Sequence, residues 1–348
     1  MTDLPALRAM PGFPDALALQ ARGDDAALVE ALAVEYQRLL GFNLPPYESL
    51  FVDPSAMLQA PSTGRVRTLY REAGWQIPSD VRAAADDHLG AELLALAELF
   101  ASGRPALAQR LVDQHLARWL PVFIEAYERL DPAPFYRTLG ALTLGTVMGM
   151  LPEAPCPAPR AELDSDPGRA AQSPRAAGSS DPAASPEVQA LLDAAWQDAA
   201  RMPGRAPRAA RAVEAVDPAS TPLDPDGGLG LRELVRQLCA PQSAGFFLSR
   251  HDLAVMARAA DLPGAAGDRS HMFESLLRSA GAYGMVEPVV AGLLARIDEA
   301  DASYAAMQET WAAWSATGGL WRARLVASRA LLAEALDRSE RPTGPMPI

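Results

Sequence analysis

The sequence predicts an all-α protein, and three features indicate this. Hydrophobic residues make up 49 % of the 348 residues, and Ala and Leu dominate that fraction, which favours helices. Aromatic residues account for only 6 %, and the β-branched residues that favour sheets are sparse outside short runs. Apolar residues also recur in successive segments with the three-to-four-residue spacing of an amphipathic helix.

Five helices are expected before residue 151. They are predicted at residues 24–40, 62–74, 86–100, 104–130 and 133–150. Acidic residues at the start of the first helix suit the positive end of its dipole, and Gly74 is a suitable stop for the second. In the fourth helix one stripe at four-residue steps contains Leu107, Leu111, His115, Trp119, Phe123 and Tyr127. Pro121 should kink this helix, because its ring clashes with the preceding turn.

A proline-rich segment is expected to separate two helical regions. The predicted division is a helical domain at residues 1–150, a linker at 151–228, a further helical region at 229–340 and a tail at 341–348. Residues 151–230 hold 13 of the 31 prolines, with Ala, Ser, Gly and Asp between them. Such a composition cannot bury enough apolar surface to offset the entropy of ordering. One helix is expected within it, at residues 185–202.

Helical patterning resumes near Leu229. Helices are predicted at residues 249–262, 267–281, 287–316 and 320–336, and the chain after residue 336 is expected to fray. Ser249 and Asp252 form a capping-box pattern. Pro288 suits the first turn of a helix, where its missing N–H costs nothing.

Charge and cysteine usage exclude several protein classes. The net charge is −12, and all 31 basic residues are arginine, so general binding to nucleic acid or to an anionic membrane is not expected. Cys156 and Cys239 lie far apart, which excludes a disulfide framework and fits a reducing compartment. Neither a secretory signal nor an apolar run of membrane-spanning length is found. The protein is therefore expected to be cytoplasmic.

Residues 84–94, AADDHLGAELL, gather acids around one of only four histidines. His88 and Glu92 have the i, i+4 spacing at which both could face one metal ion. However, no His-Glu-x-x-His pattern is present, and the third ligand would have to be His115 on another helix. A histidine that caps a helix or bonds between helices is therefore favoured over a metal ligand.

Signals for catalysis are equally weak. Ser249, His251 and Asp252 are the residue types of a catalytic triad, but residues so close on a helix start cannot face one another as a triad does. Neither a nucleophile elbow nor a phosphate-binding glycine loop is found. We therefore expect no enzyme activity, no cofactor and no metal.

Two segments leave a structural and a functional interpretation open. His115 and Trp119 fit core packing, with each ring N–H finding a partner, or the wall of a groove for an apolar peptide. The connection LPPYESLF, residues 44–51, fits a rigid turn with Tyr47 on the core, or a binding segment of the kind that connections often carry.

Five of these segments, in order, resemble motifs of the TorD/DmsD/NarJ family of molybdoenzyme maturation chaperones. They are residues 35–53, 66–77, 86–99, 115–126 and 134–142. The resemblance implies a helical bundle without catalysis. It implies a chaperone that binds the twin-arginine leader and the apo-form of a DMSO-reductase-type molybdoenzyme, assists insertion of its cofactor and delays its export. Residues 229–340 lie outside the resemblance.

The resemblance also implies where the peptide binds. Residue by residue, it assigns recognition to Tyr47, Glu48, Asp87, His88, His115 and Trp119. Glu92 is expected as a further contact for arginine. The expected apolar surface is formed by Leu93, Leu96, Trp119 and Phe123, because a basic leader with an apolar stretch needs carboxylates beside an apolar groove. Asp86 is expected only to cap the helix. Ala84 and Ala85 depart from the Glu-Pro pair that relatives commonly have there.

A second hypothesis is an assembly subunit for a nitrate-reductase-type complex, which grips a folded enzyme domain without a signal peptide. The two hypotheses differ in whether the client enzyme carries an N-terminal Arg-Arg leader. The sequence leaves open the client, the role of residues 229–340, and whether the chain forms a homo-oligomer.

Overall fold

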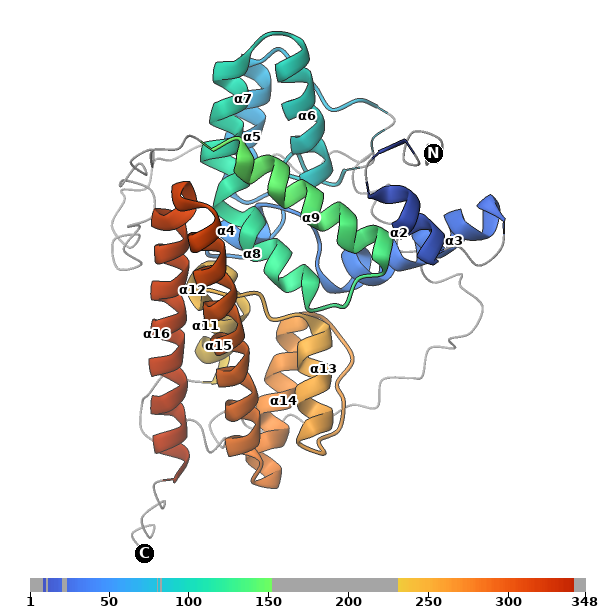
Figure 1. Cartoon of the computed structure of the whole chain (residues 1–348). Coiled ribbons are helices and arrows are strands. Elements are labelled where there is room, and N and C mark those ends of the chain that lie inside the picture. Colours follow the sequence, from blue (N-terminus) through green and yellow to red (C-terminus); the bar gives the residue numbers. More distant parts are fainter. Residues whose placement is uncertain are drawn as a thin grey trace, which may run out of the picture. The chain divides into compact units, whose positions relative to one another are not determined.

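The computed structural model describes residues 9–10, 12–20, 24–79, 81, 83–151 and 231–340. Within these residues every regular element is a helix (Figure 1), and the one extended pairing is an isolated bridge between Tyr47 and His88. The all-α prediction is confirmed for this part of the chain. None of the helices in it combines the length and the apolar character that a membrane span needs.

The N-terminal helices lie close to their predicted positions. They are α2 (Phe13–Gln20), α3 (Asp25–Tyr36), α4 (Ser49–Val52), α5 (Pro61–Glu72), α6 (Leu89–Ala101), α7 (Pro105–Leu111), α8 (Ala117–Glu128) and α9 (Pro134–Gly149), with π-helical turns η1 (Gln37–Asn43) and η2 (Val112–Leu116). Asp24 caps α3 by accepting the Ala27 N–H at 2.9 Å. Gly74, with φ +60°, follows α5 as predicted. Neither α2 nor the four-residue α4 was expected from the sequence pattern.

The second helical region begins at residue 231. It contains α11 (Leu231–Cys239), α12 (Pro241–Ala244), α13 (Arg250–Ala259), α14 (Arg269–Tyr283), α15 (Val286–Thr310), the 3-10 turn η4 (Ala312–Trp314) and α16 (Ser315–Glu340). The capping box is confirmed, since Ser249 and Asp252 exchange side chain–backbone bonds of 2.9 and 3.0 Å. α16 continues past residue 336, where fraying was expected. Apart from Leu151, the predicted linker and its helix at 185–202 lie outside the described residues, as does the tail at 341–348.

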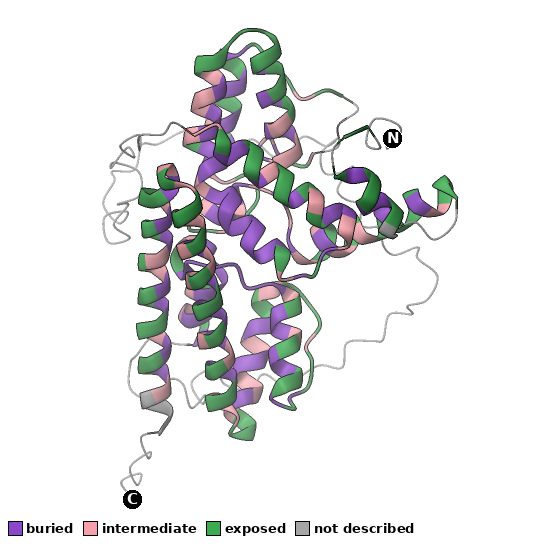
Figure 2. Cartoon of the chain, in the orientation of Figure 1, coloured by how far each residue is buried: buried purple, intermediate pink, exposed green. Residues whose placement is uncertain are grey.

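The described helices share one hydrophobic core with α8 at its centre. Every residue of α8 from Trp119 to Tyr127 is buried, and Figure 2 shows this helix almost wholly in the colour of buried residues. The ring of Phe51 on α4 lies 5.3 Å from the ring of Trp119 and 5.3 Å from the ring of Phe247. The chain after α12 therefore packs against the N-terminal helices.

A buried ion pair joins α8 to α15. Arg296 donates to the two carboxylate oxygens of Glu125 at 2.8 and 2.6 Å, and the same guanidinium donates to the carbonyl of Phe247 at 3.2 Å. The side chains of Arg296 and Glu125 are 1 % and 4 % exposed. Removing one partner from such a pair leaves an uncompensated buried charge, which typically costs about 3–5 kcal/mol.

Pro121 lies inside α8, and the carbonyl that it leaves without a backbone donor is bonded by a side chain from a distant segment. Proline has no N–H, so the Ala117 carbonyl lacks its usual helical donor. The indole N–H of Trp314 donates to that carbonyl at 2.9 Å, and the indole N–H of Trp321 donates to the next one, of Arg118, at 3.0 Å. Side chains from η4 and α16 thus complete the hydrogen bonding of α8.

Replacing Trp314→Phe should remove the donor to the Ala117 carbonyl and lower the free energy of unfolding by about 1–3 kcal/mol beyond the effect of lost volume. The double variant with Pro121→Ala isolates this bond, because the introduced alanine supplies a backbone N–H that can reach the Ala117 carbonyl. Urea denaturation should therefore give a smaller cost for Trp314→Phe in the Pro121→Ala background. Equal costs in both backgrounds would show that the indole bond contributes nothing.

Candidate functional site

The connection between η1 and α4 pairs with the start of α6. The N–H of Glu48 donates to the carbonyl of Asp87 at 3.0 Å, and the N–H of Leu89 donates to the carbonyl of Pro46 at 2.9 Å. The rings of Tyr47 and His88 meet edge to face, with centroids 5.0 Å apart. The paired prolines remove two donors but keep their carbonyls, so this short segment can still pair with another chain segment.

His88 caps α6. Its Nδ1 accepts the N–H of Gly90 at 3.0 Å, as the predicted capping histidine would. Burial lowers the pKa of His88, while the charge of Asp87 acts in the opposite direction. The prediction that Asp86 caps this helix is wrong, because the helix begins at Leu89. Asp86 instead pairs with Arg67 at 2.6 Å.

Asp87 is fully buried and holds two helices together. One carboxylate oxygen accepts the N–H of Ser49, the first residue of α4, at 2.8 Å. The other accepts the hydroxyl of Thr63 on α5 at 2.9 Å. Neither partner was predicted, because these contacts join segments 38 and 24 residues apart that no local pattern connects.

Glu48 and His115 form a buried polar pair. A carboxylate oxygen of Glu48 lies 2.8 Å from Nδ1 of His115, and the two side chains are 0 % and 3 % exposed. The pair links the loop before α4 to the turn η2. The expectation that the His115 ring finds a partner is confirmed. The buried indole N–H of Trp119 makes no hydrogen bond of ordinary geometry to the described residues, but it lies close enough to the Glu92 carboxyl to oppose the rise in its pKa.

Glu92 is fully buried without a hydrogen bond to either carboxylate oxygen from the described residues. Burial is the main reason that its pKa is raised well above the ordinary value, and the charges of Glu48 and Asp87 raise it further, against a smaller opposing effect of Trp119. Glu92 therefore favours its neutral, protonated form. This carboxyl group differs from the ionised contact for arginine that the sequence suggested.

The structure brings all seven predicted residues into one cluster but exposes little of it. Tyr47 and His88 are partly exposed. The buried members are Glu48, Asp87, Glu92, His115 and Trp119. Of the expected apolar surface, Leu96 and Phe123 belong to the core and Leu93 is half-buried. In this conformation a ligand at the surface of the cluster meets an aromatic ring and an imidazole above buried carboxyl groups.

A metal centre finds no support in this cluster. Among the described residues, no group of three or more His, Cys, Asp or Glu side chains is placed to hold an ion. The carboxyl groups of Asp87 and Glu48 already face Ser49, Thr63 and His115. Their arrangement suits positioning of the loop and an attraction for positive charge.

Comparison with known proteins shows what the N-terminal region is similar to. Residues 5–125 match the family model described as nitrate reductase delta subunit. The chain is 33 % identical over 117 residues to the Tat proofreading chaperone DmsD of Salmonella typhi. The aligned segment covers 32 % of this chain and 57 % of the relative. The chain is 27 % identical over 129 residues to the probable Tat proofreading chaperone DmsD of Haemophilus influenzae, covering 35 % of this chain and 62 % of the relative.

Over residues 5–125 the chain is similar to the TorD/DmsD/NarJ family. The resemblance seen in the sequence motifs is thereby confirmed. The chain spans about 57–62 % of the length of these curated relatives. The TorD/DmsD/NarJ model ends inside α8, so α9 and residues 231–340 lie beyond it.

Replacing Glu92→Gln should change how stability depends on pH. A carboxyl group whose pKa is raised by folding contributes stability that is present below its unfolded pKa, near 4.5. That contribution is lost by about 1.4 kcal/mol per pH unit as the pH rises toward the folded pKa. Glutamine keeps the shape and cannot ionise, so the variant should gain stability relative to the wild type between pH 5 and pH 8 in urea denaturation.

The exposed Glu98 on the same helix provides the control for this measurement. Its replacement Glu98→Gln should follow the wild-type pH profile. If Glu92→Gln also runs parallel to the wild type, the Glu92 carboxyl is ionised in the folded protein and the assignment is wrong.

Proposed function

We propose that this chain is a chaperone for a DMSO-reductase-type molybdoenzyme. It binds the twin-arginine leader and the apo-form of that enzyme in the cytoplasm, assists insertion of the cofactor and delays export. The names of the two relatives, both Tat proofreading chaperones, support this role. The proposal assigns no catalytic step to the chain.

The observation that carries the proposal is the Tyr47–His88 pair above buried carboxyl groups. A guanidinium group binds carboxylates and stacks on aromatic rings. Tyr47 offers a ring at the surface, and burial lowers the pKa of His88, so a neutral imidazole does not repel an arginine. Glu48 and Asp87 lie directly behind this pair, where a low dielectric strengthens their attraction for a cation.

The proposal divides the cluster into two roles. Tyr47 and His88 contact the peptide, whereas Glu48, Asp87 and His115 hold the loop in place and supply negative potential. Direct contact of the peptide with Glu92 or Trp119 stays a prediction, and it requires the loop at residues 45–49 to move away from α6.

The alternative function is an assembly subunit that binds a folded enzyme domain without a leader. The description of the matching family model, nitrate reductase delta subunit, favours it. Co-purification from the native host separates the two, because the captured molybdoenzyme either carries an N-terminal Arg-Arg leader or lacks one.

Replacing His88→Asn tests the contact without losing the helix cap, since asparagine is a good N-cap residue. Binding of a synthetic leader peptide with an Arg-Arg pair should weaken about tenfold by calorimetry, the loss expected for a desolvated cation–ring contact. Tyr47→Leu should weaken it similarly. Both variants should unfold near the wild-type temperature, whereas His88→Ala should also lose stability through the cap.

Two controls complete this test. A peptide with Lys-Lys in place of Arg-Arg should bind the wild type more weakly, because lysine lacks the planar fork. His271→Asn, on the exposed first turn of α14, should bind the Arg-Arg peptide as the wild type does. Unchanged affinity in folded His88→Asn and Tyr47→Leu proteins would refute the site.

A further inference from the structure

The N-terminal cluster supplies little apolar surface to a ligand. A leader of the proposed kind has an apolar stretch after its arginines. Of the side chains expected to receive it, Leu93 is half-buried, and Leu96, Trp119 and Phe123 are buried in the core. If the proposed function holds, the apolar stretch needs another surface. The described part of the chain offers one in the region beyond the family match.

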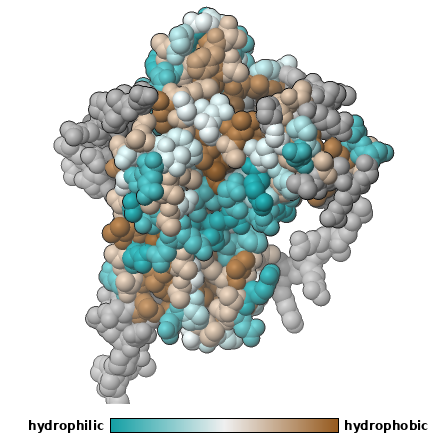
Figure 3. All heavy atoms as spheres, viewed as in Figure 1, coloured by the Kyte–Doolittle hydropathy of each residue, from teal (hydrophilic) through white to brown (hydrophobic). Residues whose placement is uncertain are grey.

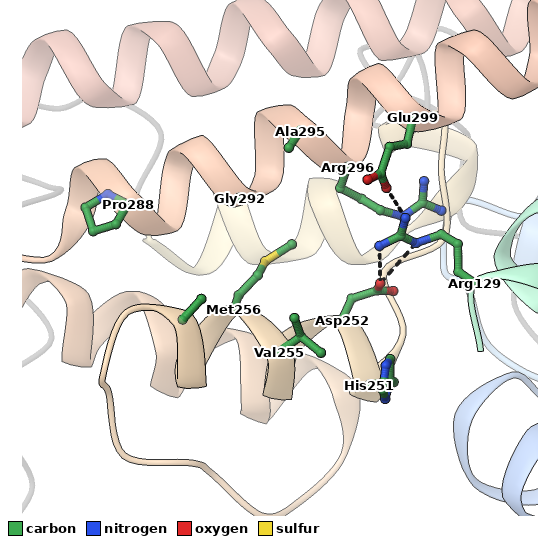
Figure 4. Close-up of a pocket in the computed structure, with 11 residues that line it drawn as sticks. Arg129, His251, Asp252, Val255, Met256, Pro288, Gly292, Ala295, Arg296 and Glu299 are labelled. Carbon is green, nitrogen blue, oxygen red and sulfur yellow. Dashed lines mark hydrogen bonds and ion pairs between the residues drawn. The ribbon is translucent and has the colours of Figure 1, made fainter. Parts of the chain in front are cut away.

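A groove of about 300 Å³ lies between α13 and α15. Its apolar walls are Val255, Met256 and Ala259 on α13 and Pro288, Gly292 and Ala295 on α15. Figure 4 shows the two helices running side by side with these residues between them and the charged residues gathered at one end. Most of the groove is therefore lined by apolar residues, and one end is lined by charged residues.

Small residues keep this groove open. Pro288, Gly292 and Ala295 follow one face of α15 at i, i+4 and i+7. A Cβ atom on Gly292 would lie only 3.3 Å from Cγ of Met256, so a larger side chain there would close the space. Val255 is left 44 % exposed on the opposite wall. Met256 is flexible and polarisable, and such side chains adapt to varied apolar ligands.

The polar end carries a net negative charge. Arg129 pairs with Asp252 at 2.9 Å and also with Glu299, and Arg296 pairs with Glu125. The groove lining itself carries two arginines and two carboxylates, and the buried Glu125 behind Arg296 brings this network of ion pairs to a charge of −1. The side chain of Glu299 is 56 % exposed and can be reached by a ligand.

The surface view agrees with this division. Figure 3 shows a hydrophilic band across the middle of the face, with tan and brown surface below it over α13 and α15. A ligand that fits both parts is a peptide with an apolar stretch and a basic residue beside it. Amphipathic or apolar helices bind grooves of this kind through side chains at i, i+3 and i+4.

We propose that the groove between α13 and α15 binds the apolar stretch of the same leader peptide, with a flanking basic residue of the peptide at Glu299. The inference rests on the proposed function, and it gives residues 231–340 a part in recognition. The Tyr47–His88 pair then binds the arginines, and the groove binds the apolar stretch that follows them.

Two synthetic peptides test this inference on the full chain. Both carry an Arg-Arg pair, one followed by a Leu/Ala-rich stretch and the other by a Gly/Ser stretch of equal length. Ala295→Trp fills the groove and should weaken binding of the Leu/Ala peptide at least tenfold by calorimetry. The matched control Ala291→Trp places the same side chain at an exposed position of α15 outside the groove lining. It should bind within twofold of the wild type.

The Gly/Ser peptide should bind more weakly than the Leu/Ala peptide and should be insensitive to Ala295→Trp. Glu299→Gln should weaken a Leu/Ala peptide with a flanking lysine but not one with a flanking glutamine. Methyl-labelled Met256 should shift in NMR spectra of the wild type with the Leu/Ala peptide, and it should not shift with the Gly/Ser peptide. This last readout does not depend on any substitution being tolerated.

Contrary results are distinguishable. If folded Ala295→Trp protein binds the Leu/Ala peptide like the wild type, the groove is not the site, and the proposed function stands. If Val34→Trp, which fills a hollow along α3, causes the loss instead, the apolar stretch binds there and the groove proposal is overturned. If the wild type binds neither peptide, the proposed leader recognition fails, and the groove proposal fails with it.

Discussion

The bidentate ion pair between Glu125 and Arg296 constrains the rest of the structure. Its guanidinium also holds the carbonyl of Phe247, and the Phe247 ring stacks on Phe51 of α4. α4 begins directly after Glu48, so the position of the loop before α4 is connected to α15 through two aromatic rings and one arginine. A buried pair of this kind adds little net stability over an apolar core, but it admits few alternative arrangements. The same arginine helps to lower the pKa of Asp252, which burial alone would raise.

The loop before α4 contacts a second buried polar group. In this group the acidic side chains are not paired with any described arginine. Among the described residues, Glu48, Asp87 and Glu92 lie together without an arginine partner, and the hydrogen bonds of Glu48 and Asp87 come from His115, Thr63 and the Ser49 N–H. Burial is the main reason that the pKa of Glu92 is raised well above its ordinary value. The two polar groups therefore differ in their partners, because Glu125 is paired with an arginine whereas Glu48 and Asp87 are bonded to an imidazole, a hydroxyl and a backbone N–H.

Much of the fold could be predicted from the sequence, because helical patterns are local. The periodic stripes, the stop at Gly74 and the capping box at Ser249 all depend on neighbouring residues, and all three are confirmed. For the site, the sequence predicted which residues lie together but not which of them are buried or what they contact. Whether Trp119 faces a groove or the core depends on Phe51, which contacts its ring from a distant segment and is itself stacked on Phe247. The cap of α6 fell on His88 rather than Asp86 because the pairing with Pro46 fixes where that helix begins, and no local rule contains that pairing.

The proline in α8 also sets an order of events during synthesis. The carbonyl that Pro121 leaves without a donor is completed by Trp314, 197 residues later in the chain than Ala117, and Glu125 precedes its partner Arg296 by 171 residues. At about 5–20 residues per second, translation takes about 10–40 s to bridge the longer interval. Through that time the nascent N-terminal helices carry an unpaired acid and a free carbonyl at their centre, and Phe51 and Trp119 lack part of their cover. The hydrogen bonding at the centre of the N-terminal helices is therefore complete only after residues 296–321 have been synthesised.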